Sequence, residues 1–184
     1  MNSSVLRVPP PVFPEAPPGL RFSGHDTPLG RLRLEMESGT LTGIRFPARG
    51  PDPAQSSGAG GDSRPFAEIR HQLDEYFAGR LREFDLALRM IGTPFQQAVW
   101  AGLLAIPYGE TWSYARLATQ IGRPQSGRAV GAACGSNPLS IVVPCHRVIG
   151  TNGRLTGFGG GLAAKRWLLN LEAGARPSQL WATV

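Results

Sequence analysis

The stretch Thr93-Pro94-Phe95-Gln96 constrains the fold more strongly than any other part of this chain. A threonine followed three residues later by glutamine is a capping box, in which the two side chains satisfy backbone N–H groups at the start of a helix. Proline is favoured at the first helical position because it has no N–H to satisfy. We therefore predict a helix that begins here and runs to about Ile106, just before Pro107.

Two shorter helices are predicted directly after it. Ser113 can cap a helix that runs through Gln120, and Gly122 ends that helix. The pair Arg123-Pro124 then turns the chain into a second helix over residues 125–134. Two short helices joined by a few residues resemble a helix-turn-helix, an element that many proteins use to bind DNA.

The second helix of this pair, QSGRAVGAAC, consists mainly of Gly, Ala and Val. Apart from Gln125, Ser126 and Arg128 it carries none of the side chains that usually discriminate between bases. A helix this smooth can lie close to a narrow groove, and we expect it to bind DNA with weak sequence specificity. The alternative is that its small residues only pack one helix against the other.

The half of the chain before Met90 has a different pattern. Residues 32–36 alternate apolar and polar side chains, and Leu41, Ile44 and Phe46 suggest a partner strand beyond the turn at residues 38–39, which predicts two antiparallel strands. A helix is predicted from Pro65 to Gly79, and residues 84–88 alternate again as a last strand. The apolar stripe of this helix is formed by Ile69, Leu73, Tyr76 and Phe77. The whole chain is therefore expected to have an α/β (α+β) fold, with a small sheet plus one helix in this half.

Composition divides the chain into two domains and two tails. Residues 1–18 are rich in proline and are expected to form a flexible tail. The first domain is assigned to residues 19–90, with a flexible Gly/Pro/Ser-rich loop at 50–64. The second domain is assigned to residues 91–178, and residues 179–184 form a short second tail.

The two halves also differ in charge. The formal net charge of the chain is +6, but residues 1–89 contain 11 basic and 11 acidic residues. Residues 90–184 contain 8 basic residues and only two acidic ones, Glu110 and Glu172. The second half is therefore the part expected to bind a polyanion, and nucleic acid is the commonest polyanionic partner of a basic domain. The alternative is a charge that serves only solubility.

The chain has two cysteines, Cys134 and Cys145, and three histidines. These are too few for a disulfide framework and show no zinc-ligand spacing, so we expect a reduced protein without a bound metal. The N-terminus lacks an apolar signal segment, and the apolar run at residues 98–106 is far too short to span a membrane. We therefore expect a cytoplasmic protein with no membrane partner.

Cys145 lies in the stretch IVVPCHRVI. We predict a strand over residues 141–143 that Pro144 ends, which places Cys145 at a rigid strand exit. A cysteine becomes a good nucleophile when a base takes its proton, and His146 is the obvious candidate. Because neighbours on a strand point to opposite faces, His146 is expected to act through a water or a local kink. The alternative is an inert buried thiol, which is how we interpret Cys134.

Catalytic imidazoles are usually oriented by a carboxylate, and Glu172 is the better candidate in this half. The apolar stripe of the last helix begins at Ala164, and Glu172 lies on the same stripe eight residues later. A carboxylate on a buried face needs a partner, which His146 would supply. The alternative is that Glu172 frays into solvent near Gly174. For Arg147 the sequence leaves a surface charge and an ion-pair member equally open.

Together these residues resemble a known family. The pentapeptide PCHRV at 144–148, preceded by Asn137-Pro138 and by GTPFQQAVWAGLLAIPYGETWSYARLA, is similar to the O6-alkylguanine-DNA alkyltransferases, also called methylated-DNA–protein-cysteine methyltransferases. The similarity begins near Thr27 with TPLGRLRLEMESGTLTGIRF and extends through Glu172. PCHRV at this spacing from a helix-turn-helix is a highly specific signature.

The resemblance implies an amino-terminal ribonuclease-H-like domain and a carboxy-terminal winged helix-turn-helix domain. It implies a DNA repair enzyme that acts once, on double-stranded DNA that contains alkylated guanine. The alkyl group on O6 of a flipped-out guanine, or on O4 of thymine as a second lesion, passes irreversibly to a cysteine sulfur. No cofactor is implied, and we expect a monomer associated with the nucleoid.

The resemblance also assigns catalytic roles to five residues of this sequence. Cys145 is the acceptor, His146 takes its proton through a bound water, and Glu172 holds His146. Asn137 supports the turn that positions the active-site segment. Tyr114 donates a proton toward a guanine nitrogen as the bond to O6 breaks.

DNA binding is assigned by the same resemblance to the helix pair. Arg128 enters the duplex and fills the gap left by the flipped base, while the smooth helix lies in the minor groove. The other residues expected at the DNA are Ser126, Ala129, Ala132, Gly135, Thr111 and Ser113. The base pocket is expected to include Pro144, Arg147, Val148, Phe158, Gly159 and Gly160. Main-chain groups of Cys145 and Val148 would read the guanine edge, and the backbone near Gly159 would bind O6.

Some positions depart from the family pattern. Phe158 stands where a tyrosine is common, and Gly159 stands where a larger residue often occurs, so only a backbone donor remains there. Ser140 replaces a proline found in some members. These changes favour a roomier or more mobile pocket, and the sequence therefore predicts no range of alkyl groups.

Two other functions remain open at this point. A cysteine hydrolase could be built on Cys145, His146 and Glu172, although the sequence shows no oxyanion loop for it. The second alternative is a non-catalytic protein that binds alkylated DNA or acts as a regulator. The presence of Cys145 counts against that alternative, since related alkyltransferase-like proteins lack the cysteine.

Overall fold

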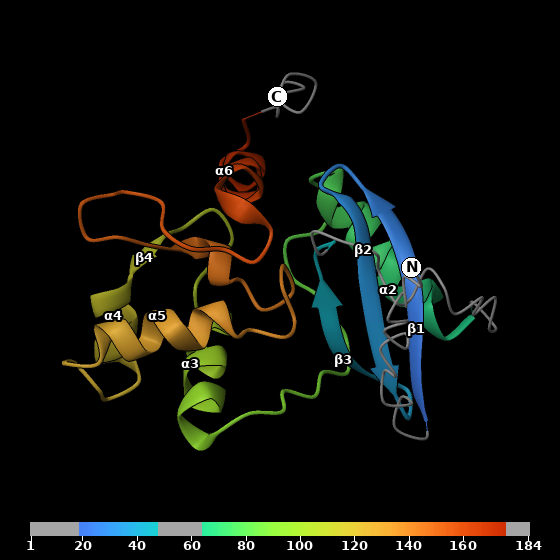
Figure 1. Ribbon diagram of the computed structural model, residues 1–184. Coiled ribbons are helices and arrows are strands. Elements are labelled where there is room, and N and C mark those ends of the chain that lie inside the picture. The colour runs from blue at the N-terminus through green and yellow to red at the C-terminus, as the bar shows by residue number, and fades with distance from the viewer. Residues whose placement is uncertain (1–18, 48–63, 176–184) are drawn as a thin grey trace, which may run out of the picture.

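The computed structural model describes residues 19–47 and 64–175. Figure 1 shows the N-terminal sheet at the right with a helix behind it and the helices of the C-terminal half at the left, with the chain that precedes α3 (Pro94–Leu104) running between them. The mixed α/β fold expected from the sequence is confirmed. The two predicted tails and almost all of the predicted loop at 50–64 lie outside the described residues.

The N-terminal sheet contains three antiparallel strands in sequence order. They are β1 (Leu20–Thr27), β2 (Gly30–Glu37) and β3 (Thr40–Arg45). The two strands predicted from alternation correspond to β2 and β3 and are confirmed. No strand is predicted at β1, because its sequence LRFSGHDT lacks regular apolar alternation beyond Phe22. It forms nonetheless, since it pairs with β2 along its whole length.

One helix packs on this sheet, as expected. A short 3-10 turn, η1 (Arg64–Phe66), leads into α2 (Ala67–Phe77). The helix ends near Gly79, whose φ of +73° is a left-handed conformation that glycine adopts easily. Its buried residues are Ile69, Gln72, Leu73 and Tyr76. The predicted helix is therefore confirmed, with Tyr76 on its inner face.

The predicted strand at residues 84–88 is wrong. This segment makes only an isolated bridge, between Leu88 and Leu41 of β3. The next part of the β3 edge is already occupied, because the N–H of Ile44 donates to the carbonyl of Pro138 at 2.8 Å. A segment of the C-terminal half thus takes the place that a fourth strand would need.

The C-terminal half contains the predicted helices. The capping box at the start of α3 is present, with Thr93 and Gln96 each accepting from the other's backbone N–H. The helix pair consists of α4 (Tyr114–Gln120) and α5 (Gly127–Gly135), and the last helix is α6 (Gly161–Glu172). None of the described helices is both long and apolar enough to cross a membrane.

Two short strands connect the helix pair to the segment around Cys145. They are β4 (Trp112–Ser113) and β5 (Val148–Ile149), which pair in parallel. The start of α4 therefore lies directly beside the end of the PCHRV stretch. This pairing joins the start of the helix-turn-helix to the cysteine segment, although Trp112 and Val148 are 36 residues apart in sequence.

The predicted strand at residues 141–143 is also wrong. The chain forms a buried turn there, with Ile141 at a φ of +76° and a bridge between Ser140 and Val143. Cys145 then opens a single 3-10 turn, η2 (Cys145–Arg147). A positive φ is costly for a β-branched residue, so the surrounding structure must hold it in place. The cysteine thus sits at a tight corner rather than at a strand exit.

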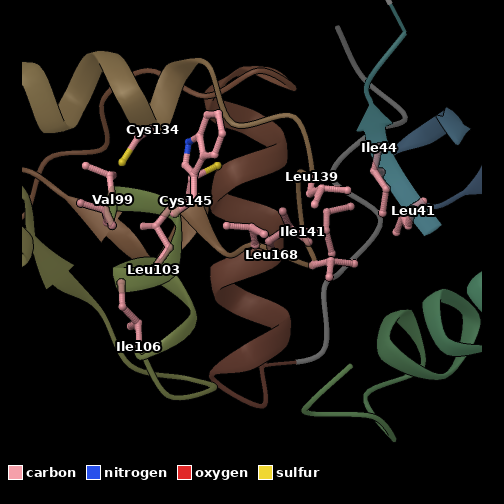
Figure 2. Packing of buried hydrophobic residues seen from close by; sticks show 14 of the residues in the cluster. Leu41, Ile44, Val99, Leu103, Ile106, Cys134, Leu139, Ile141, Cys145 and Leu168 are labelled. Carbon is pink, nitrogen blue, oxygen red and sulfur yellow. The ribbon is translucent and has the colours of Figure 1, made fainter. Parts of the chain in front are cut away.

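The core is continuous between the two halves. Figure 2 shows Leu139, just before the turn, and Ile141, within it, lying toward Ile44 and Leu41 of β3. Leu139 and Ile44 also form an isolated bridge. The N-terminal sheet therefore supports the turn that carries Cys145.

Loss of the α3 cap should destabilise the protein measurably. Thr93→Ala removes the oxygen that accepts from the Gln96 N–H, and we expect the free energy of unfolding to fall by about 1 kcal/mol. Denaturant titration measures this loss. Thr119→Ala is the matched control, because Thr119 is exposed within α4 and only bonds back to Ala115. A control loss equal to that of Thr93→Ala would contradict the capping role.

Candidate active site

Cys145 is a buried thiol at the centre of the C-terminal half. Its 3-10 turn packs against α3, as Figure 2 shows, and only 6% of the residue is exposed. Burial raises the pKa of the Cys145 thiol, and the hydrogen bond from Asn137 and the charge of Lys165 only partly oppose this. The sulfur is therefore protonated at rest, so a base must remove its proton before it can react.

His146 has the geometry of that base. Its ring is fully buried, and Nε2 lies 2.9 Å from Oε1 of Glu172. Because an ionised carboxylate only accepts, Nε2 carries the proton and Nδ1 holds the free lone pair. Nδ1 has no hydrogen-bond partner among the described residues. Burial lowers the pKa of His146 despite the Glu172 contact, which keeps the imidazole neutral and able to accept a proton.

The Glu172 carboxylate is surrounded by donors. Oε1 lies within 2.9 Å of three of them, on Tyr76, His146 and Arg147. Oε2 accepts from Arg147 at 2.8 Å and from the backbone N–H of Gly109 at 3.1 Å. Burial alone raises the pKa of this carboxyl, but the hydrogen bonds from His146 and Arg147 outweigh it and bring the pKa to about 2. The carboxylate is therefore ionised and oriented, and it does not fray into solvent.

Arg147 neutralises this carboxylate. Its guanidinium reaches both carboxylate oxygens of Glu172, and Nη1 donates to the carbonyl of Ile106 at 2.6 Å. Two-point contacts of this kind are well matched to a carboxylate and hold it in one orientation. The question that the sequence left open is thereby decided, because Arg147 is a buried ion-pair member.

Asn137 ties the turn that precedes Cys145. Its amide nitrogen donates to the carbonyl of Val143 at 2.7 Å, and its Oδ1 accepts from the N–H of Leu139 at 3.0 Å. The side chain is buried, so both polar ends are satisfied inside the protein. These bonds span the strained residue Ile141 and fix the corner at which the thiol sits.

Lys165 is a buried residue that sequence reasoning misses. Its Nζ donates to the carbonyls of Val148 at 2.6 Å and Thr156 at 2.9 Å, and it lies 5.9 Å from the ring centre of Tyr114. Burial lowers the pKa of Lys165. The signal was available, because Lys165 lies seven residues before Glu172 and therefore on the same face of α6.

An open cleft lies between α5 and the segment that precedes α6, with a volume of about 570 Å³. It is lined by Tyr114, Gly127, Arg128, Gly131, Gly135, Thr156, Gly157, Phe158 and Gly159. The ring of Phe158 lies 6.3 Å from that of His146, so the cleft adjoins the buried base. A Cβ on Gly159 would meet nothing within 4 Å, so the cleft is open at that point.

Not every residue expected in the base pocket lines this cleft. Pro144 and Arg147 line a second cavity of about 420 Å³. Val148 is fully buried in the core. Gly160 packs against Phe46, whose ring a Cβ there would approach to 2.7 Å.

The exposed face of α5 is as smooth as its sequence suggests. Arg128, Ala129, Ala132 and Gly135 are exposed, whereas Val130, Ala133 and Cys134 face the core. Arg128 therefore projects from an otherwise flat surface at the edge of the cleft. Of the remaining residues expected at the DNA, Thr111 is exposed and Ser126 is half-buried. The Ser113 hydroxyl is used to cap α4 through the N–H of Arg116.

The arrangement defines a class of protein. A buried thiol stands next to a buried imidazole, and an open cleft adjoins that imidazole through Phe158. The cleft is walled by the smooth face of a helix pair in the basic half, which suits the backbone of DNA. No group of three or more potential metal ligands occurs among residues 19–47 and 64–175. The class is thus a DNA-binding protein with a nucleophilic cysteine.

Comparison with known families makes the assignment specific. Residues 94–174 match the DNA-binding domain of 6-O-methylguanine DNA methyltransferase, and residues 20–90 match the ribonuclease-like domain of the same proteins. The chain belongs to the methylated-DNA–protein-cysteine methyltransferase family. This membership favours alkyl transfer over the cysteine hydrolase and the non-catalytic protein that the sequence left open.

Individual relatives of this chain come from the same family. The methylated-DNA–protein-cysteine methyltransferase of Mycobacterium tuberculosis is 49% identical over 155 residues, which cover 84% of this chain and 93% of that protein. The Haemophilus influenzae protein of the same name is 42% identical over 154 residues, or 83% of this chain and 86% of that one. The crystal structure of the M. tuberculosis O6-methylguanine methyltransferase matches with a TM-score of 0.78 at 46% identity, over 86% of this chain and 96% of that chain. The M. tuberculosis OGT in complex with DNA matches with a TM-score of 0.74 at 48% identity, with the same coverage.

Removal of the Glu172 charge should change the stability and its pH dependence. Because the folded pKa of Glu172 lies below the ordinary 4.5, its contribution is present above that pH and is lost as the pH falls toward about 2. Glu172→Gln leaves Arg147 buried without its counter-charge, so we expect a loss of roughly 3 kcal/mol near neutral pH. The variant should also lose that part of the acid dependence.

Denaturant titrations between pH 2 and pH 7 measure both effects. Glu110→Gln is the control, since Glu110 is exposed in the same half of the chain. If Glu172→Gln retained the acid dependence of the wild type, the assigned ionisation of Glu172 would be wrong.

Proposed function

We propose that this protein repairs DNA by accepting the alkyl group of O6-alkylguanine onto Cys145 in a single, irreversible transfer. The observation that carries the proposal is the buried His146–Glu172 contact of 2.9 Å, which leaves Nδ1 of the residue next to Cys145 as a free base. Relatives with this family name supply the substrate class.

The proposed transfer balances as follows. The Cys145 Sγ–H proton passes to Nδ1 of His146 through a water, and Glu172 stabilises the resulting imidazolium. The sulfur electron pair forms the new S–C bond to the alkyl carbon, and the O6–C bond breaks with its electrons going to guanine. A proton from Tyr114 to a guanine ring nitrogen completes a normal base, and the proton held by His146 returns to the Tyr114 oxygen through water, so both side chains end neutral. The remaining thioether has no leaving group that water could displace, so each protein molecule reacts once.

Tyr114 is suited to supply the proton to guanine. It lines the cleft, and its hydroxyl accepts from Thr156 at 3.0 Å, which leaves its own proton free to be donated. Burial raises the pKa of Tyr114, so the phenol stays protonated at neutral pH. Lys165 lies close to the Tyr114 ring and helps to position it.

Access to Cys145 requires a flipped base. The O6-alkyl group of a stacked guanine cannot reach a buried sulfur, and flipping costs a few kcal/mol, less for a poorly paired damaged base. A cleft of about 570 Å³ has the size of a small-molecule site, and it adjoins His146 through Phe158. Arg128 would occupy the gap in the duplex while the smooth face of α5 lies in the minor groove.

We assign the neutral domain to residues 19–90 and the DNA-binding and acceptor domain to residues 91–178. The partner is duplex DNA with alkylated guanine, which the basic second half would meet through phosphate contacts in the nucleoid. One chain contributes every residue of the site, so we expect the monomer to be active.

The acceptor role of Cys145 can be measured by mass spectrometry. Incubation with a duplex oligonucleotide that contains O6-methylguanine should add one methyl group to the peptide with Cys145, in a 1:1 stoichiometry and without turnover. Cys145→Ser should abolish the transfer and retain DNA binding, because it removes only the nucleophile. Cys134→Ser is the control and should still be methylated on Cys145. An unmodified Cys145 under native conditions would exclude the proposed function.

The role of Arg128 can be separated from the chemistry. Arg128→Ala should slow the reaction with duplex DNA at least tenfold, because nothing then fills the gap left by the flipped base. Reaction with the free base O6-methylguanine should change less than twofold. Arg123→Ala is a suitable control, since Arg123 is an exposed arginine in the turn between the two helices. Equal losses on both substrates would remove the role assigned to Arg128.

A further inference from the structure

We propose that Tyr76, a residue of the N-terminal domain, is a positioning residue that sets how readily His146 accepts the proton of Cys145. The inference rests on the proposed function above, because it concerns the base of that reaction. Apart from Tyr76, the side chains around His146 and Glu172 named above come from the C-terminal half. Tyr76 therefore makes the N-terminal domain part of the chemistry.

The contact is direct and fully buried. The Tyr76 hydroxyl lies 2.7 Å from Oε1 of Glu172 and 3.4 Å from Nε2 of His146, and the residue has no exposed surface. Its ring packs against Phe84 at 5.2 Å and against Tyr108 at 6.1 Å between ring centres. The hydroxyl is thus held in place by aromatic contacts on the ring and cannot swing away without disrupting the core.

The direction of the hydrogen bond follows from proton counting. Nε2 of His146 already carries a proton and Glu172 is ionised, so Oε1 of Glu172 is the acceptor that the Tyr76 hydroxyl reaches within the described part of the chain. Burial raises the pKa of Tyr76 well above its ordinary value, with Glu172 as the second cause, so the phenol remains a donor at every physiological pH.

The hydrogen bond from Tyr76 makes Glu172 less able to stabilise a protonated His146. A carboxylate oxygen that already accepts from Tyr76 and Arg147 has less negative charge to offer to a protonated His146. Burial and the charges of Arg147 and Lys165 act in the same direction on the pKa of His146, whereas Glu172 opposes them. Cys145 is neutral at rest, and Tyr108 is a further titratable group near the carboxylate among the described residues, with its pKa raised by burial and by Glu172. Tyr76 therefore helps to keep the base neutral and ready.

Tyr76→Phe tests the inference by removing one oxygen atom and leaving the ring. Without this donor Glu172 stabilises the imidazolium better, so His146 should protonate at higher pH. We expect the acid limb of the pH–rate profile for methyl transfer to move up by roughly half to one pH unit. Below that midpoint the rate should fall several-fold, equally for duplex DNA and for free O6-methylguanine, since the change affects chemistry and not DNA binding.

The measurement is a single-turnover time course of Cys145 methylation between pH 5 and pH 9 on protein shown by circular dichroism to be folded. Phe84→Leu is the matched control, because it loosens the packing around Tyr76 without removing the hydroxyl, and its pH midpoint should equal that of the wild type. An unshifted midpoint in Tyr76→Phe, or the same shift in Phe84→Leu, would overturn the inference. A wild-type protein that never methylates Cys145 would instead overturn the proposed function.

Discussion

The structure depends on one buried negative charge, the Glu172 carboxylate. An isolated carboxylate in a protein interior is very unfavourable, and it is tolerated only when it is paired and saturated with hydrogen bonds. Here donors converge on it from α2, from the turn at Gly109 and from the two residues after Cys145. The requirement to satisfy this charge therefore fixes the relative positions of the sheet domain, the cysteine segment and the last helix.

The Glu172 charge also determines which ring nitrogen of His146 is free to accept a proton. His146 is bound by Glu172 on one side of its ring, and the other side has a lone pair without a partner among the described residues. Burial raises the pKa of the Cys145 thiol and keeps it protonated, and a protonated thiol is a poor nucleophile. A protein that can react only once gains from such a resting state, because stray oxidants and electrophiles meet a protected thiol rather than a thiolate.

The sequence predicts those parts of the site that depend only on neighbouring residues, such as helix caps and the face of a helix on which a residue lies. The cap at Thr93, the cap at Ser113 and the position of Glu172 on the inner face of α6 follow from helix geometry alone. The turn around Ile141 does not, because apolar β-branched residues favour a strand unless tertiary contacts such as those of Asn137 override the preference. Tyr76 and its partner Glu172 are 96 residues apart in sequence. A tyrosine on the apolar stripe of a helix is normally interpreted as a core residue, so no periodic pattern could show which group its hydroxyl contacts.

The central claim is that Glu172 fixes His146 as a neutral imidazole with its proton on Nε2 and its lone pair on Nδ1. Nitrogen-15 NMR of histidine-labelled protein at pH 7 tests this most directly, with His146→Gln used to assign the signal. The account predicts a shift typical of a protonated nitrogen for Nε2 and of an unprotonated nitrogen for Nδ1, unchanged until the pH falls below 6.5, because burial lowers the pKa of His146. A doubly protonated ring at pH 7, or a proton on Nδ1 instead of Nε2, would contradict it.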